Sequence, residues 1–247
     1  PVSLMPCRGA LPFIKKIETL TYRGDNSRCI YKNRQNFSEV KNPLTTFEPT
    51  QEYNAVYALP FFTIEECDKI KEYAYKKEEE LIREGYTNTV SDAYTKSITT
   101  TNYFRYNFFR DHPIYAARFV DFLRKTRILY SYDTEWPIAV QSWVNIYRKG
   151  DGIFWHNHKG TMGSSFSANI FIDGPTKPGT VYLKENGYEI DELAVENKKG
   201  YIHIFPCNVL HKVDPVQSER ISIGITLHSE SKIDADAIDG VIILKEK

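Results

Sequence analysis

The second half of the chain alternates short apolar segments with turns, and this pattern limits the fold more than any other feature. Strands are expected at residues 139–148, 152–158, 167–173, 179–184, 188–193, 201–205 and 220–228. Turn signals separate them at Lys149-Gly150-Asp151-Gly152, Asp173-Gly174-Pro175, Asn186-Gly187 and Lys199-Gly200. Strands at such short intervals are typical of β-sandwiches and jelly-roll barrels, so we predict a mainly β fold with flanking helices.

Two amphipathic helices are expected before these strands. Thr63-Ile64-Glu65-Glu66 forms a capping box that starts a helix, which should run to about Glu84 and stop at Gly85. Its expected buried residues are Ile64, Cys67, Ile70, Tyr73 and Ala74, and its charge run at 76–80 should face solvent.

The second helix should start at His112-Pro113. Its apolar residues near helical spacing are Ile114, Ala117, Val120, Phe122 and Leu123. Residues 86–110, rich in Thr, Tyr and Phe, are expected to form extended segments and loops. Tyr103, Arg105 and Tyr106 in this stretch form either a lid over a substrate or ordinary packing.

The chain divides into three regions. Residues 1–52 are polar, broken by prolines and without clear periodicity, so an irregular N-terminal extension is expected. Residues 53–228 form the predicted β domain, which opens with a half-buried strand at 53–59. Residues 229–247 form a tail in which the apolar run 241–244 predicts an edge strand.

Composition excludes several classes of protein. The 247 residues carry 32 Lys+Arg and 32 Asp+Glu, so a basic nucleic-acid-binding footprint is absent. No apolar run reaches the roughly 18 residues of a membrane span, and the N-terminus shows no signal-peptide core. Four cysteines without metal-binding spacing are expected as free thiols in the cytoplasm.

Two of the six histidines lie two residues apart, in His156-Asn157-His158 on a predicted strand. Residues i and i+2 of a strand point to one face, so both imidazoles can meet one metal ion. His211 follows a later strand that a sandwich can bring alongside. Neutral imidazole binds iron, zinc, copper and nickel alike. The alternative is a pair of partly exposed histidines near a strand end.

An arginine opens the last apolar strand, Arg220-Ile-Ser-Ile-Gly-Ile-Thr-Leu227. It either pairs with Glu219 at the surface or holds a carboxylate inside the barrel, with Ser222 on the same face. Alternation in strand 139–148 places Asn145 and Tyr147 on one face, from which they can reach the same ligand. Trp143 and Asn169 lie near this predicted pocket.

This set of residues resembles the Fe(II)/2-oxoglutarate-dependent dioxygenases, in particular the prolyl-4-hydroxylase-like branch. The family pattern HxD/E…H…R(xS) reads here as His156-Asn157-His158, His211 and Arg220-Ile221-Ser222. The segment from Gly200 to Pro215 is similar to the family's G…FPS…H.V.P stretch. The resemblance covers about residues 53–228 and implies a double-stranded β-helix, a jelly-roll fold shared with cupins.

One position departs from the family pattern, because His158 stands where the family has a carboxylate. Some phage and bacterial relatives carry HxH here. Three imidazoles leave a +2 metal site where the usual triad leaves +1, and His158 either binds the metal or stands beside it. A halogenase-like HxG arrangement, His158-Lys159-Gly160, is a weaker alternative.

A cupin-like metalloprotein is the main competing interpretation. Gly150 and Gly200 precede His156 and His211 at cupin-like intervals, but residues 159–165 lack the expected glutamate. A non-catalytic β-sandwich is a third possibility, although it would have no need of an inward Arg220.

The resemblance therefore implies an oxygenase that hydroxylates an unactivated C–H bond and releases succinate and CO2. Its metal ligands would be His156, His158 and His211, and its 2-oxoglutarate site would contain Arg220, Ser222, Tyr147 and Asn145. Fe(II), 2-oxoglutarate and O2 are the implied cofactor and cosubstrates, with no protein acid or nucleophile required. The substrate is a protein or peptide side chain, such as proline, or a metabolite; nucleic-acid and membrane partners are not expected.

Overall fold

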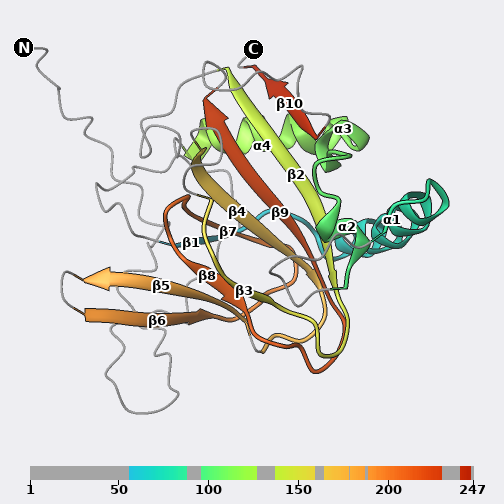
Figure 1. The fold of residues 1–247 in the computed structure, drawn as a ribbon. Helices are drawn as coiled ribbons and strands as arrows, with labels where there is room; N and C mark the ends of the chain where they lie inside the picture. Colours follow the sequence, from blue (N-terminus) through green and yellow to red (C-terminus); the bar gives the residue numbers. More distant parts are fainter. Residues whose placement is uncertain are drawn as a thin grey trace, which may run out of the picture.

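Two antiparallel sheets form the body of the protein (Figure 1). The computed structural model describes residues 56–87, 96–126, 137–158, 164–177, 179–186, 189–229 and 240–245. The large sheet has the strand order β1-β7-β4-β9-β2-β10, and the small sheet has the order β3-β8-β5-β6. The predicted mainly β fold is confirmed.

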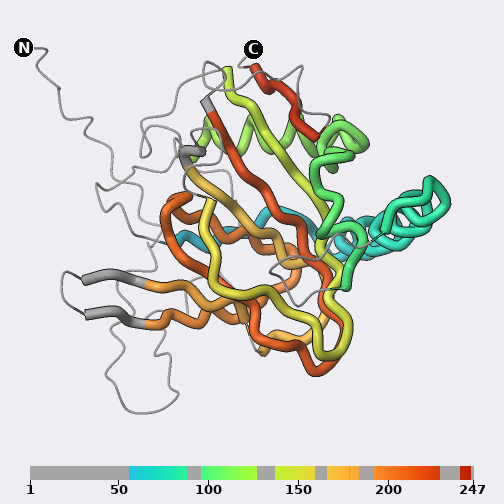
Figure 2. The backbone as a smooth tube through the Cα atoms, viewed as in Figure 1, coloured from blue at the N-terminus to red at the C-terminus, as the bar shows by residue number. Residues whose placement is uncertain are grey.

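The strands of the large sheet come from both ends of the described chain. Their bounds are β1 Tyr57–Pro60, β2 Ile138–Tyr147, β4 Ser164–Asp173, β7 Tyr201–Pro206, β9 Arg220–Ser229 and β10 Val241–Leu244. In the backbone trace, β9 lies between β4 and β2, which it pairs along its whole length (Figure 2). The predicted edge strand at 241–244 is confirmed as β10, which pairs with the start of β2.

The small sheet contains shorter strands. Their bounds are β3 Ile153–His156, β5 Thr180–Asn186, β6 Glu189–Val195 and β8 His211–Val213. The expected strand 152–158 is shorter than predicted, since β3 ends at His156 and leaves His158 in the following loop. Strand β8 was not predicted, because its three residues are too few to show alternation.

Four helices lie within the described residues. They are α1 Ile64–Arg83, α2 Ile98–Thr101, α3 Phe108–Asp111 and α4 Pro113–Thr126. The capping box is confirmed, because the Thr63 hydroxyl accepts from the Glu66 amide and the Glu66 carboxylate accepts from the Thr63 amide. Two short helices, α2 and α3, replace part of the loop expected at 86–110.

Three apolar residues expected in helix cores are instead exposed. Ile64 and Ile114 lie on solvent-facing surfaces, and Ala117 is also exposed. All three lie in the first two turns of their helices, where the buried residues are about one sequence position away from the residues predicted to be buried. Helix α4 buries Ala116, Phe119, Phe122, Leu123 and Thr126 instead.

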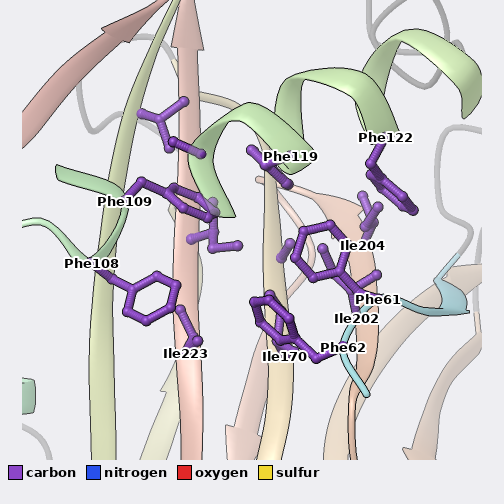
Figure 3. Packing of buried hydrophobic residues seen from close by; sticks show 14 of the residues in the cluster. Phe61, Phe62, Phe108, Phe109, Phe119, Phe122, Ile170, Ile202, Ile204 and Ile223 are labelled. Atoms are coloured by element: carbon purple, nitrogen blue, oxygen red, sulfur yellow. The ribbon is translucent and has the colours of Figure 1, made fainter. Parts of the chain in front are cut away.

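The main hydrophobic core lies between the helices and one face of the large sheet. Phe119 and Phe122 of α4 point toward this face, where Ile170, Ile202 and Ile223 lie (Figure 3). Phe61 joins them in edge-to-face contacts, with ring centroids 6.0 Å from Phe119 and 5.3 Å from Phe122. Burial of this apolar face is the main stabilising term, and it leaves the opposite face of the sheet free for polar residues.

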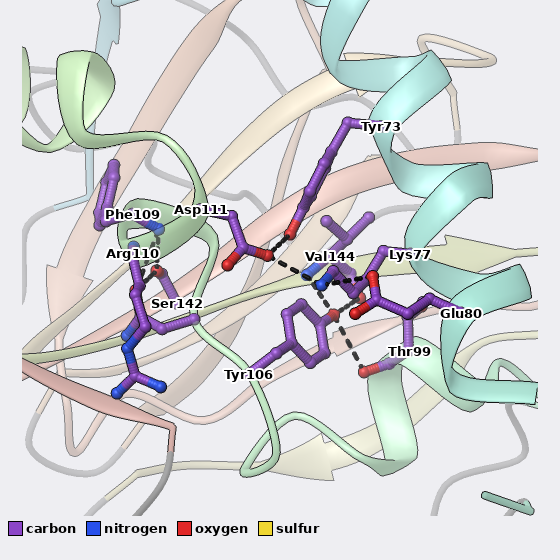
Figure 4. A network of polar contacts seen from close by, with 11 residues as sticks. Tyr73, Lys77, Glu80, Thr99, Tyr106, Phe109, Arg110, Asp111, Ser142 and Val144 are labelled. Atoms are coloured by element: carbon purple, nitrogen blue, oxygen red, sulfur yellow. Dashed lines mark hydrogen bonds and ion pairs between the residues drawn. The ribbon is translucent and has the colours of Figure 1, made fainter. Parts of the chain in front are cut away.

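A polar network around the buried Lys77 ties α1 to the short helices (Figure 4). Lys77 pairs with Asp111 at 2.9 Å and with Glu80 at 2.8 Å, and the Tyr73 hydroxyl donates to Asp111 at 2.6 Å. Lys77 is only 8% exposed, so the expectation of a fully solvated charge run was wrong at this position. A buried ammonium is stable here because two carboxylates and two aromatic rings surround it.

The described residues include two of the four cysteines that were predicted to be free thiols. Cys67 and Cys207 are free thiols, as predicted, while Cys7 and Cys29 lie outside the described residues. The extension at 1–52 and most of the tail also lie outside them. None of the described helices is long and apolar enough to cross a membrane.

Candidate metal centre

A cavity of about 460 Å³ lies between the two sheets, and residues from both sheets and from α2 line it. Period-two alternation in β9 explains its polar wall. Arg220, Ser222, Gly224, Thr226 and His228 point to the inner face, whereas the four intervening aliphatic residues belong to the core on the outer face. Strand β9 therefore contributes one face to the hydrophobic core and the other face to the cavity.

Three histidines meet on this inner side. Their ligand atoms all lie within 4.8 Å of one another. The ring centroids are 4.1 Å apart for His156 and His211, 5.2 Å for His158 and His211, and 5.4 Å for His156 and His158. The structure thus brings together the three histidines that the sequence singled out.

The strands place two of these rings and a loop places the third. His156 at the end of β3 is directly paired with His211 at the start of β8. His158 lies in the loop after β3, where its amide donates to the carbonyl of Cys207 at 2.9 Å. The prediction that His156 and His158 share one strand was therefore wrong, although both rings still reach the same point.

Hydrogen bonds orient the three rings. The Nδ1 atoms of His156 and His211 lie 2.8 Å from the Phe154 carbonyl and 3.0 Å from the Val209 carbonyl. Since a carbonyl only accepts, both Nδ1 atoms carry the proton and both Nε2 atoms keep a lone pair. The Nδ1 of His158 lies 3.3 Å from the Thr226 hydroxyl. Such contacts to the second ring nitrogen are the usual support of metal-binding imidazoles.

The environment keeps the rings neutral. Burial lowers the pKa of His156, lowers that of His158 to about 3 and lowers that of His211 well below its usual value. Mutual repulsion of the rings adds to the effect for His158 and His211. Neutral imidazoles with converging lone pairs fit a divalent transition metal such as iron or zinc.

Arg220 is the second unusual feature of this region. Its side chain is fully buried between the sheets, and Nη2 donates to the Thr180 hydroxyl at 2.8 Å. Nε and Nη1 have no hydrogen-bond partner within the described part of the chain. The pairing with Glu219 considered for Arg220 does not form; Glu219 instead accepts from the Tyr75 hydroxyl. Burial lowers the Arg220 pKa, and the nearby Tyr147 and Tyr182 oppose this effect.

The other candidate residues surround Arg220 and the cavity. Tyr147 is paired with Arg220 across β2 and β9, with its ring centroid 5.9 Å from the guanidinium carbon. Asn145 is paired with Ser222, and their side chains lie 3.5 Å apart. The side chains of Tyr147, Asn145 and Ser222 line the cavity, as do those of Trp143 and Asn169. Arg220 does not line the cavity itself; it lies behind Thr180, to which it donates a hydrogen bond.

Several residues that line the cavity were not singled out in the sequence. Thr180 accepts from both Arg220 and the Asn169 amide, at 2.8 and 3.3 Å. Gln141, Thr226 and His228 also line the cavity, although His228 had been set aside as a residue at a strand end. Alternation in β2 and β9 was the signal that could have placed these three, since they share the face of Trp143 and Ser222.

Comparison with known proteins supports the fold. No protein-family model and no curated protein sequence matches the chain. The solved structure of the non-heme monooxygenase ThoJ in its apo form has a TM-score of 0.52 at 11% identity, over 79% of this chain and 82% of that one. AviO1 from Streptomyces viridochromogenes has a TM-score of 0.50 at 12% identity, over 75% and 99%.

The viral collagen prolyl hydroxylase of Paramecium Bursaria Chlorella virus-1 matches at 14% identity, with a TM-score of 0.49 over 72% of this chain and 97% of that one. At such identities the likeness concerns the fold. The chain has the double-stranded β-helix fold seen in these structures, and its three histidines come together within that fold. The fold resemblance inferred from the sequence is thus confirmed.

Proposed function

We propose that this protein is an Fe(II)- and 2-oxoglutarate-dependent oxygenase that hydroxylates an unactivated C–H bond, within a catalytic domain at residues 53–228. One observation carries the proposal. A fully buried arginine, two of whose nitrogens have no hydrogen-bond partner among the described residues, lies between the same two sheets as three converging neutral histidines. A buried cation is stabilised when an anion pairs with it, and a cluster of neutral imidazoles is a typical binding site for a metal ion.

His156, His158 and His211 would hold the iron. Their neutral state means that metal binding has no proton to displace from an imidazolium, and the hydrogen bonds at Nδ1 keep the rings in place. Three neutral ligands leave the site with the full +2 charge of the metal, which favours an anionic cosubstrate. When bound, Fe(II) with 2-oxoglutarate and O2 supplies the C–H oxidation, and succinate and CO2 are the co-products.

Arg220 would hold the distal carboxylate of 2-oxoglutarate. Its free N–H groups are the donors, and Ser222, Tyr147 and Asn145 provide further polar contacts near it. Arginine suits this role because it stays protonated even where burial lowers its pKa. The substrate that we expect is a protein or peptide side chain, such as proline, or a small metabolite.

Anaerobic titration with Fe(II) and 2-oxoglutarate tests the proposal. We expect a weak visible charge-transfer band, and we expect Arg220→Gln to weaken 2-oxoglutarate binding at least tenfold. Arg118→Gln is the matched control, since Arg118 of α4 pairs with Glu66 of α1, away from the cavity.

Thermal shift with Zn(II), which is redox-inert, gives a second readout of the same binding. Absence of both the band and any stabilisation by 2-oxoglutarate would contradict the proposed function. Equal 2-oxoglutarate affinity in the Arg220→Gln variant would remove Arg220 from the site.

A further inference from the structure

The cavity continues past the histidines, away from Arg220. Trp143 and Gly224 are paired across β2 and β9, as Tyr147 and Arg220 are, but four residues further along the strands. At about 3.3 Å per residue this places them roughly 13 Å from the Tyr147–Arg220 pair. His158 lies beside this part of the cavity, with its ring 6.3 Å from Trp143. We call the region lined by Thr100, Tyr103, Gln141, Trp143 and Thr226 the distal half.

We propose that the distal half binds the substrate through an uncharged group that combines a ring-shaped apolar face with one hydrogen-bonding function. This inference rests on the proposed function, because it assigns to the same site a chemical class of substrate. Three observations on the described part of the chain carry it: the wall has no charged side chain, one side of it is aromatic, and one buried hydroxyl in it has no hydrogen-bond partner.

The wall lacks formal charge. None of the described residues that line the whole cavity is a lysine, arginine, aspartate or glutamate. Gln141 and Thr226 supply dipoles only, and both are almost completely buried. A charged substrate group would therefore lose its hydration without gaining an ion pair.

Trp143 gives the distal half its flat aromatic side. A Cβ on Gly224 would lie 2.5 Å from Cε2 and 2.6 Å from Cζ2 of Trp143, so the indole packs directly against the backbone of β9. Its Nε1 donates to the Asn145 side chain at 2.9 Å, which leaves no indole donor for a ligand. Tyr103 packs against it with a centroid distance of 5.2 Å and is 37% exposed, so this wall reaches the surface.

Thr100 supplies the hydrogen-bonding position. Its side chain is 8% exposed and lines the cavity, and its hydroxyl has no partner within the described residues. A buried hydroxyl without a partner is destabilising, and a ligand group that forms a hydrogen bond with it removes that cost. A hydroxyl, amide or carbonyl on the substrate would meet this requirement without bringing charge.

Tyr106 is the positioning residue for this pair of features. Its hydroxyl accepts from the Val144 amide at 2.9 Å and lies 3.2 Å from the Thr99 carbonyl, to which it can donate (Figure 4). It thereby links α2 to β2 at residues directly next to Thr100 and Trp143. Tyr106 therefore helps to fasten the helix that carries the Thr100 hydroxyl to the strand that carries the Trp143 indole.

Three ligands that share one ring but differ in charge test the proposal: cyclohexanol, cyclohexylammonium and cyclohexanecarboxylate. Binding is measured by saturation-transfer NMR on protein loaded with Zn(II) and 2-oxoglutarate, after 2-oxoglutarate binding has been measured by itself. We expect cyclohexanol to bind at least tenfold more tightly than either ion. Equal or tighter binding of either ion would overturn the proposal, and tighter carboxylate binding would show that the metal charge dominates.

Two matched pairs of variants locate the binding. Thr100→Val removes the hydroxyl with little change of shape and should weaken cyclohexanol binding severalfold, whereas the exposed Thr176→Val should not. Trp143→Leu should abolish binding, whereas Trp155→Leu, outside the cavity and beneath Lys212, should leave it intact. Unchanged affinity in Thr100→Val and Trp143→Leu would overturn the assignment.

The two proposals fail in distinguishable ways. Failure of 2-oxoglutarate to bind the metal-loaded protein contradicts the proposed function itself. Normal 2-oxoglutarate binding without any cyclohexanol binding contradicts only the inference about the distal half.

Discussion

His158 differs from the other two histidines in how its ring is held. The rings of His156 and His211 face backbone carbonyls, which fix the position of their protons, whereas His158 faces the hydroxyl of Thr226. A hydroxyl can donate or accept, so Thr226 leaves the tautomer of His158 open. His158 is also the residue that lies in a loop instead of a strand. Its role as a ligand therefore needs its own test.

We expect His158→Ala to weaken divalent metal binding by on the order of 100-fold, because one of three converging lone pairs is lost. Competition with a chromophoric chelator measures the affinity for Zn(II) and Fe(II). His112→Asn is the control, since His112 packs among Tyr73, Phe108 and Tyr115, outside the histidine cluster. Unchanged affinity in His158→Ala would remove this residue from the ligand set.

The sequence predicted the residues with unusual chemistry and missed the ordinary ones. Histidines two apart and an arginine at the start of an apolar strand are conspicuous. Thr100 and Thr180 are not, because a threonine in a helix or strand has the same pattern whether it faces a cavity or a neighbour. Lys77 was missed for the converse reason: the Asp111 carboxylate that pairs with it lies 34 positions away in the chain.

At the scale of elements, α2 is the piece that local sequence could not predict. Four residues are too few for intrinsic helix stability, and three of them are β-branched threonines. The Ser97 side chain caps its first turn, and Tyr106 joins it to β2. Tertiary contacts thus create this helix, and with it one wall of the cavity.

Tyr106→Phe should therefore destabilise the protein by about 1–3 kcal/mol, because the buried Val144 amide loses its acceptor. Urea denaturation measures the change in the free energy of unfolding. The control is Tyr103→Phe, whose ring is partly exposed and whose stability should stay within about 0.5 kcal/mol of the parent. A Tyr106→Phe protein as stable as the parent would mean that the hydroxyl does not fasten α2 to β2.

At the scale of the whole molecule, neutral histidines make the fold sensitive to acid. His203 is completely buried behind the cavity, and burial together with Arg220 lowers its pKa to about 3. In the unfolded chain its pKa returns to about 6.5. Between these two values the unfolded state binds one more proton than the folded state, so stability falls as the pH falls.

We expect the metal-free protein to lose free energy of unfolding as the pH drops below about 6.5, by up to about 1.4 kcal/mol per pH unit for His203 alone. Urea denaturation at pH 7.5, 6.5, 5.5 and 4.5 gives the slope. His203→Gln cannot titrate and should show a shallower slope than the parent, while both proteins should show little difference in slope above pH 7. Parallel curves for the two proteins throughout would contradict the neutral state of His203 in the fold.

The overall architecture was predictable because alternation and turn signals recur over nearly a hundred residues. The pairing order was less accessible, since β1 pairs with β7 and β9 separates β4 from β2, across long stretches of chain. Local sequence carries little information on such distant pairings. The fold resemblance supplied what the local patterns lacked.

The alternation in β9 also has a consequence for how this protein can change over time. Arg220, Ser222 and Thr226 lie on the inner face of the sheet only because an aliphatic residue follows each of them toward the core. Inserting or deleting one residue in this strand would exchange the two faces, sending the guanidinium into the helices and isoleucines toward the histidines. New specificities in a lineage of this protein should therefore arise by substitutions within β9, whereas gains and losses of length should fall in the connections between strands.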